Sequence, residues 1–132
     1  MWMIIAGIFL ILHGMVHLLY AGQGGRYFEL RPGLLWPDGS WLFSKLLGDE
    51  STRLLATILL ALAALTYISG GLGLLFRQEW WRAGAIIAAT FSSMIFILFW
   101  DGRFKDLDAK GGVGILINLA VLFVILILKW QP

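Results

Sequence analysis

Long apolar runs separated by short polar stretches dominate this chain. Four of them, each nearly free of charge in its middle, cover about residues 2–21, 52–76, 80–100 and 111–130. A helix needs roughly 20 mainly apolar residues to cross a bilayer. None of the runs alternates apolar and polar residues, as a membrane β-strand would. The pattern therefore predicts an all-α membrane protein whose four transmembrane helices form an antiparallel bundle.

The composition supports the lipid bilayer as the solvent of this fold. Of 132 residues, 60% are hydrophobic and only 14% are charged, whereas roughly a quarter of a typical soluble domain is charged. We therefore expect a single transmembrane domain over residues 1–132, with the bilayer as its main partner. The net charge of +2 is too small for a nucleic-acid-binding surface, and the absence of cysteine excludes disulfides and thiolate chemistry.

The first polar stretch, loop one, covers about residues 22–51 and is longer than a plain connection requires. Pro37 and Gly39 indicate a turn, after which Ser40 is placed to cap a short helix over about residues 40–47. Apolar residues beside Ser44 and Lys45 suit a helix that lies at the membrane interface. Loop one is therefore predicted to hold a short interfacial helix.

Basic residues are concentrated at one end of the predicted bundle. Loop one, the helix start that follows it, and loop three (about residues 101–110) hold seven of the ten Lys and Arg residues: Arg26, Arg31, Lys45, Arg53, Arg103, Lys105 and Lys110. Under the positive-inside rule, loops rich in Lys and Arg stay in the cytoplasm. We therefore expect a multi-pass protein with loops one and three on the cytoplasmic side.

The first apolar run contains the only two histidines of the chain, His13 and His17. On a helix, side chains four residues apart point to the same face, and these two are about 6 Å apart along the axis. Tyr20 continues the same stripe. Ionisable residues inside a membrane span usually mark relays, pathways or ligand sites, or pair with other polar groups.

Three interpretations of the histidine pair stay open. Neutral imidazoles could bond to Asn118, Ser92 or a backbone carbonyl and lock the helices together. Alternatively, the same groups with Tyr20 could bind a ligand or relay protons. Finally, His13 and His17 could chelate one metal ion, with loop carboxylates as further ligands. The sequence identifies no cofactor.

Charged side chains gather at the end of the bundle where loop one begins: Arg26, Glu29, Arg31, Asp38, Asp101 and Arg103, with Lys105, Asp106 and Asp108 close by. They form either an interface belt of salt bridges between loops or a polar mouth in which a cation could hold the head group of a ligand. Paired acids can serve acid–base chemistry, but no spacing singles out an enzyme. We predict no catalytic residues and favour a protein that is not an enzyme.

Several short motifs, taken in order, resemble a known group of proteins. They are Ile11-Leu12-His13-Gly14, Trp36-Pro37-Asp38-Gly39-Ser40, Trp80-Trp81, Phe99-Trp100-Asp101-Gly102-Arg103 and Lys110-Gly111-Gly112-Val113-Gly114. Over nearly the whole chain they are similar to small bacterial four-helix membrane proteins, which broadly resemble the DoxX-like membrane proteins in the first helix and the general plan. The resemblance implies the inner (cytoplasmic) membrane of a prokaryote and a link to quinone and redox physiology. It brings no catalytic residues.

Three functions follow as hypotheses. The first is a binding protein that takes a hydrophobic molecule, such as a quinone or lipid, between its helices with the polar end near His13, His17 and Asn118. The second is a small transporter or channel along the histidine stripe, although the other helices carry few polar residues at mid-depth. The third is a homo-oligomer or a non-catalytic accessory subunit of a larger membrane complex, packed through faces of small residues.

Overall fold

The computed structural model describes residues 1–132 and is entirely helical, with no strand. Its elements are α1 (Trp2–Gly24), α2 (Phe43–Leu75), α3 (Trp81–Leu98), the 3₁₀ helix η1 (Leu107–Lys110), α4 (Gly112–Leu122) and the π-helical η2 (Phe123–Ile127). Helices α1, α2 and α3 are each long and apolar enough to cross a membrane. The prediction of an all-α chain is confirmed, and these three helices indicate a multi-pass membrane protein.

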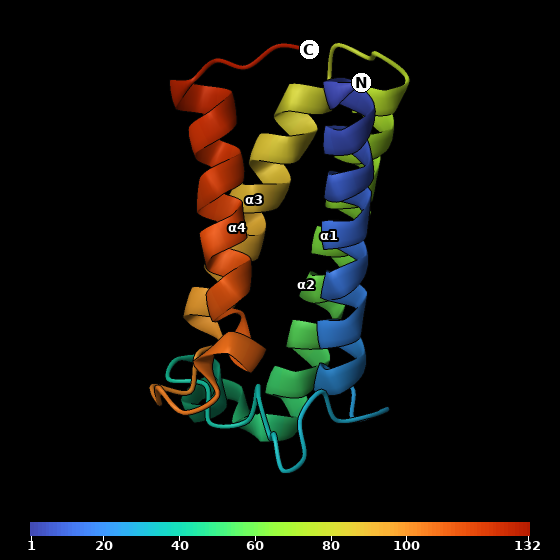
Figure 1. The fold of residues 1–132 in the computed structure, drawn as a ribbon. Helices are drawn as coiled ribbons and strands as arrows, with labels where there is room; N and C mark the ends of the chain where they lie inside the picture. Colours follow the sequence, from blue (N-terminus) through green and yellow to red (C-terminus); the bar gives the residue numbers. More distant parts are fainter.

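The helices lie side by side along the long axis of the molecule, with both termini at one end (Figure 1). Loop one, between α1 and α2, and loop three, between α3 and α4, lie together at the other end. Helix α1 packs against α2, α2 against α3, and α3 against α4, whereas α1 and α4 make little contact with each other. One side of the molecule, between α1 and α4, is therefore not closed by helix packing.

Glycines bring α1 and α2 into close contact. A Cβ atom at Gly14 would lie 2.9 Å from the Cβ of Tyr67 and 3.0 Å from the carbonyl oxygen of Ala64. A Cβ atom at Gly71 would lie 2.7 Å from the carbonyl oxygen of Gly7. Small residues matter at such a contact because lipid provides no hydrophobic drive and van der Waals packing must hold the helices together.

Helix α2 begins earlier than the predicted residue 52 and is broken near its start. Gly48 has φ 78° and ψ 165°, a conformation that a residue with a side chain rarely adopts. The short helical segment before this break begins at Phe43 instead of the predicted residue 40. The hydroxyl oxygen of Ser40 accepts a hydrogen bond from the Phe43 N–H at 3.2 Å, as an N-cap side chain does.

The fourth helix is shorter than the predicted range of residues 111–130. Together α4 and η2 cover Gly112–Ile127, which falls among the shorter apolar helices of 10–17 residues. The left-handed conformation of Gly111, with φ 95°, marks its start. At the other end the hydrogen bonds change to the π-helical pattern, and Lys129 adopts a positive φ of 50° that ends the helix. The other differences are small: α1 continues to Gly24 and α3 ends at Leu98.

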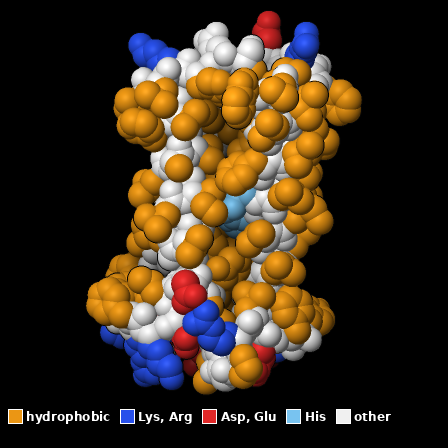
Figure 2. Space-filling model, in the orientation of Figure 1, with side chains coloured by type: hydrophobic (Ala, Val, Ile, Leu, Met, Phe, Trp, Pro, Cys, Tyr) orange, Lys and Arg blue, Asp and Glu red, His pale blue; other side chains and the backbone are white.

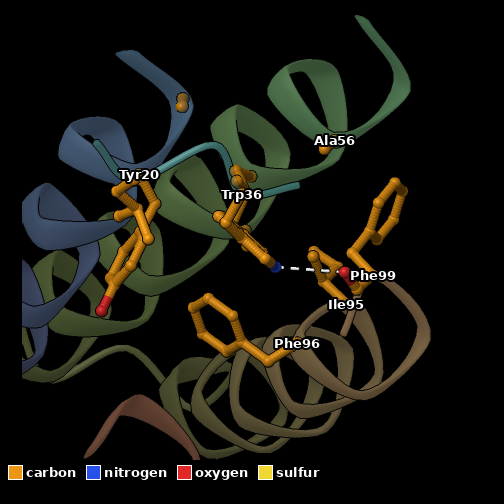
Figure 3. Close-up of a cluster of buried hydrophobic side chains, with 10 residues drawn as sticks. Tyr20, Trp36, Ala56, Ile95, Phe96 and Phe99 are labelled. Atoms are coloured by element: carbon orange, nitrogen blue, oxygen red, sulfur yellow. Dashed lines mark hydrogen bonds between the residues drawn. The ribbon is translucent and has the colours of Figure 1, made fainter. Parts of the chain in front are cut away.

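Loop one folds back onto the end of the bundle. The indole N–H of Trp36, whose side chain is 1% exposed, donates to the carbonyl oxygen of Phe99 at 3.1 Å (Figure 3). The buried amide of Gln23 donates to the carbonyl oxygens of Leu34 and Trp36 and accepts from the Leu30 N–H. These bonds satisfy backbone groups that are buried where loop one folds onto the bundle.

The contact at Gly14 predicts the effect of enlarging that residue. Gly14→Val should lower the free energy of unfolding by about 1–3 kcal/mol, because α1 and α2 would have to separate to make room. Thermal unfolding in mild detergent, followed by circular dichroism, measures the change. Ala83→Val, at an exposed position of α3, is the matched control and should unfold close to the wild type. Equal melting of both variants would show that the glycine contact does not limit the packing.

Candidate functional site

A cluster of polar side chains lies in the interior of the bundle, and all four helices contribute to it: His13 and His17 from α1, Tyr67 from α2, Ser92 and Ser93 from α3, and Asn118 from α4. We call these six residues the polar network. His17 is 1% exposed and Asn118 is 0% exposed, so the centre of the network is shielded from the surroundings, whereas Ser93 is only partly buried. The structure thus brings together His13, His17, Ser92 and Asn118, the groups that the sequence analysis selected.

The side-chain amide of Asn118 is the centre of the network. Its oxygen accepts hydrogen bonds from the Tyr67 hydroxyl at 2.5 Å and from Nε2 of His13 at 3.1 Å. Its nitrogen donates to the hydroxyl oxygens of Ser92 at 2.9 Å and Ser93 at 3.1 Å. All four hydrogen-bonding positions of the amide are therefore used.

These bonds assign opposite tautomers to the two histidines. Nδ1 of His17 lies 2.8 Å from the carbonyl oxygen of His13, which can only accept, so this nitrogen carries the proton. Nε2 of His17 then accepts from the Ser92 hydroxyl at 2.5 Å. In His13 the proton is on Nε2, because that nitrogen faces the accepting oxygen of Asn118. Both imidazoles are neutral in this arrangement, as the cost of charge inside a membrane favours.

One nitrogen of the network has no protein partner. Nδ1 of His13 makes no hydrogen bond, and no fully buried side-chain nitrogen or oxygen lacks one. His13 as a whole is 5% exposed. Nδ1 of His13 is therefore a free hydrogen-bond acceptor at an accessible edge of an otherwise satisfied network.

An apolar groove runs between α1 and α4 on the side that helix packing leaves open. It encloses about 420 Å³, and all 13 residues that line it are hydrophobic. Trp2, Trp81 and Trp130 line its end near the termini. Figure 2 shows this hollow between the two helices, with histidine visible at its floor.

The inner end of the groove borders the polar network. Phe9, one of the lining residues, stacks parallel to the His13 imidazole with their ring centroids 6.1 Å apart. On α4, the lining residue Ile117 is the immediate neighbour of Asn118 in the sequence. The site therefore combines a long apolar wall with a single polar region at one end.

The charged residues of the loops form a separate group at the opposite end. Asp38 pairs with Arg26 at 2.8 Å and with Arg53 at 2.9 Å, and Asp101 pairs with the buried Lys110 at 2.7 Å. The pair of Asp38 with Arg53 joins loop one to α2, and the pair of Asp101 with Lys110 joins the two ends of loop three. Each Arg and Lys of these pairs is bonded to a carboxylate of the protein itself. This arrangement corresponds to the interpretation of the charged residues as a belt of salt bridges.

Arg31 connects loop one to loop three. Its guanidinium pairs with Asp106 at 2.6 Å and with Asp108 at 2.7 Å. Hydrogen bonds from this guanidinium hold the pKa of the Asp108 carboxyl below its usual range, so the pair stays charged into mildly acidic conditions. Of the remaining residues of the predicted mouth, Glu29 accepts from the Gly33 N–H, and the backbone N–H of Arg103 donates to Asp101.

Tyr20 does not join the polar network, although the helical stripe places it next to His17. Its hydroxyl donates to the carbonyl oxygen of Asp108 at 3.2 Å, so it belongs to the loop end. Phe96 lies between the two groups, with its ring 5.7 Å from that of His17 and 5.2 Å from that of Tyr20. An aromatic layer therefore separates the charged loops from the histidines.

The geometry bears on the metal and relay interpretations of the histidine pair. No group of three or more His, Cys, Asp or Glu side chains is arranged to hold a metal ion. Both nitrogens of His17 are already hydrogen-bonded, so it would have to give up a bond to become a ligand. A proton passing from His13 towards Ser92 would cross the Asn118 amide, which would have to take an unstable imidic form. The network is better suited to holding groups in place than to moving protons.

Two members of the network were not selected from the sequence. Tyr67 lies in a polar and glycine-rich part of the second apolar run, which is equally typical of a packing patch. Ser93 is the neighbour of Ser92 in the sequence and also accepts from Asn118, but it does not bond to His17 and donates to the carbonyl oxygen of Ala89. Spacing within one helix shows which residues share a face, but not which depth on another helix they meet.

No family model, curated protein or solved structure matches the chain.

The central place of Asn118 predicts how strongly the fold depends on it. Asn118→Leu keeps the size of the side chain but leaves the Tyr67 hydroxyl and the His13 N–H without their acceptor. We expect the free energy of unfolding to fall by about 2–4 kcal/mol, since each buried unpaired group costs roughly 1–3 kcal/mol. Ser93→Ala removes only one bond at the edge of the network and should cost less than about 1 kcal/mol. Chemical unfolding in detergent compares them; equal losses would contradict a central role for the amide.

Proposed function

We propose that the chain is a four-span antiparallel bundle in the inner (cytoplasmic) membrane of a prokaryote, with loops one and three in the cytoplasm. The common end of the two termini and the concentration of Lys and Arg in loops one and three support this topology. Exposed tryptophans at both ends, among them Trp2, Trp80 and Trp41, suit the two membrane interfaces. The short fourth span fits if Lys129 and Trp130 anchor its end and the bilayer thins locally.

We further propose that this protein binds a hydrophobic, lipid- or quinone-like molecule in the groove between α1 and α4. One observation carries the proposal: an entirely apolar groove of about 420 Å³ ends beside the polar network. Small-molecule sites commonly have volumes of roughly 300–1,000 Å³ and apolar walls with a few polar groups that set orientation. The groove has these properties, and it opens to the side where membrane molecules would enter.

The polar network gives the groove a direction. A tail of hydrocarbon finds apolar partners along the whole groove, whereas a polar head group finds them only near His13 or among the tryptophans at the other end. A network that served helix packing alone would need no open groove beside it. We favour ligand binding over transport, because a groove lined only by apolar side chains offers an ion no polar path.

Photolabelling of the protein in lipid nanodiscs tests the groove. The probe is para-dodecylphenol with a diazirine at the end of its chain, and mass spectrometry locates the labelled peptides. Labelling should be saturable and, with the phenol near His13 and the diazirine at the end of the tail, should concentrate on lining residues nearer the termini such as Trp81, Val124 and Ile125. Ala120→Phe, which places a ring in the groove, should reduce saturable labelling at least about fivefold.

Ala83→Phe is the matched control, because it makes the same exchange at an exposed position away from the groove. Its labelling should equal that of the wild type. Labelling spread evenly over every lipid-facing surface, without saturation and unaffected by Ala120→Phe, would mean that the groove holds no specific molecule.

A further inference from the structure

We infer that the molecule bound in the groove carries a head group that donates a hydrogen bond, a hydroxyl or an N–H, and that Nδ1 of His13 accepts it. This inference rests on the proposed function, since it concerns the same groove. It adds a chemical requirement: reduced, hydroxyl-bearing amphiphiles such as quinols, alkylphenols or long-chain alcohols are preferred over molecules whose head groups only accept hydrogen bonds.

The requirement follows from the acceptors to which the hydrogen-bond donors of the network are already bonded. The protons of His13 Nε2 and of the Tyr67 hydroxyl are both donated to the Asn118 oxygen. The Asn118 amide donates to two serines, the Ser92 hydroxyl donates to Nε2 of His17, and Nδ1 of His17 donates to a carbonyl. The Ser93 hydroxyl donates to the carbonyl oxygen of Ala89 at 2.8 Å. No donor is left for a ligand.

Only an acceptor remains where the polar network borders the inner end of the groove, next to the lining residue Phe9. Nδ1 of His13 is unprotonated in the tautomer that Asn118 imposes, and it has no protein partner. The residues that line the groove next to it are all hydrophobic. The carbonyl of an oxidised quinone or an ester would therefore lose its water without gaining a donor, whereas a hydroxyl would gain an acceptor.

The alternative orientation of the bound molecule places its head group at the other end of the groove, among the tryptophans. Trp2, Trp81 and Trp130 each carry an indole N–H, which can donate to a head group that only accepts. A molecule held there would lie with its head near the termini and its tail towards His13. In that orientation the identity of residue 13 would not affect the choice between donor and acceptor head groups, which separates the two cases by experiment.

The tautomers can be measured without any ligand. The chain has only two histidines, so ¹⁵N NMR of histidine-labelled protein in detergent gives two imidazoles, assigned by a single His17→Gln variant. We expect one neutral imidazole protonated at Nε2, His13, and one protonated at Nδ1, His17. A His13 protonated at Nδ1 would remove the free acceptor and overturn the inference.

Competition against the diazirine probe tests the head group itself. Para-dodecylphenol is compared with para-dodecylfluorobenzene, and dodecanol with dodecyl fluoride, because fluorine is close to a hydroxyl in size and cannot donate. Each hydroxyl compound should compete roughly two- to tenfold better than its fluoride, the range expected for one hydrogen bond. The pair with the larger ratio shows whether a phenolic or an aliphatic hydroxyl fits better.

His13→Leu supplies the control for partitioning into the membrane. Leucine removes the acceptor at residue 13, while the Asn118 oxygen keeps its hydrogen bond from the Tyr67 hydroxyl. Partitioning is the same in wild type and variant, so any difference in the hydroxyl-to-fluoride ratio comes from the site. We expect the ratio to fall to about one in His13→Leu, while labelling by the probe persists. His17→Gln, which leaves Nδ1 of His13 untouched, should keep a ratio above one.

Two failures have different meanings. If hydroxyl and fluoride compounds compete equally in the wild type, or if His13→Leu keeps the full ratio, the groove still binds apolar molecules but the donor requirement is wrong. If no compound competes and the probe labels without saturation, the proposed function fails together with the inference.

Discussion

The side-chain amide of Asn118 is the interaction on which the rest of the structure depends. In a bilayer, helices gain little by hiding apolar surface from one another, because the lipid is equally apolar. A polar group that bonds to three other helices therefore sets their relative height and rotation. Asn118 does this from α4, through Tyr67 of α2, His13 of α1 and the two serines of α3. It also determines which nitrogen of His13 is left free.

Uneven packing around this centre produces the groove. Close backbone contacts join α1 to α2, and they also join α2 to α3, where a Cβ atom at Gly70 would lie 3.1 Å from the Ala85 nitrogen. Between α1 and α4 the polar network replaces such contacts, through the bond from His13 to Asn118. The helices are thus held together at the depth of the polar network and remain apart towards the termini, which leaves an apolar space that ends beside this network.

Much of the fold was predictable from the sequence, because long uncharged runs have few solutions other than helices in lipid. The histidine stripe and its partners Asn118 and Ser92 were also accessible, since polar groups inside such runs need one another. The break at Gly48 was not, because apolar residues continue across it and only the backbone conformation reveals it. The parts played by Tyr67, Gln23 and Trp36 depend on which helices meet at which depth, and no spacing within one helix contains that information.

The lateral opening of the groove changes what controls its occupancy. A site that opens into water responds to the dissolved concentration of its ligand. In the proposed membrane orientation, this groove, whose lining includes Trp2 and Trp130 near the termini, would open into the hydrocarbon of the half of the bilayer nearest the termini. Its occupancy would follow the mole fraction of the ligand among neighbouring lipids, reached by diffusion in two dimensions. The protein would then report on, or buffer, the make-up of a single leaflet, and each lipid species of that leaflet would act as a competitor.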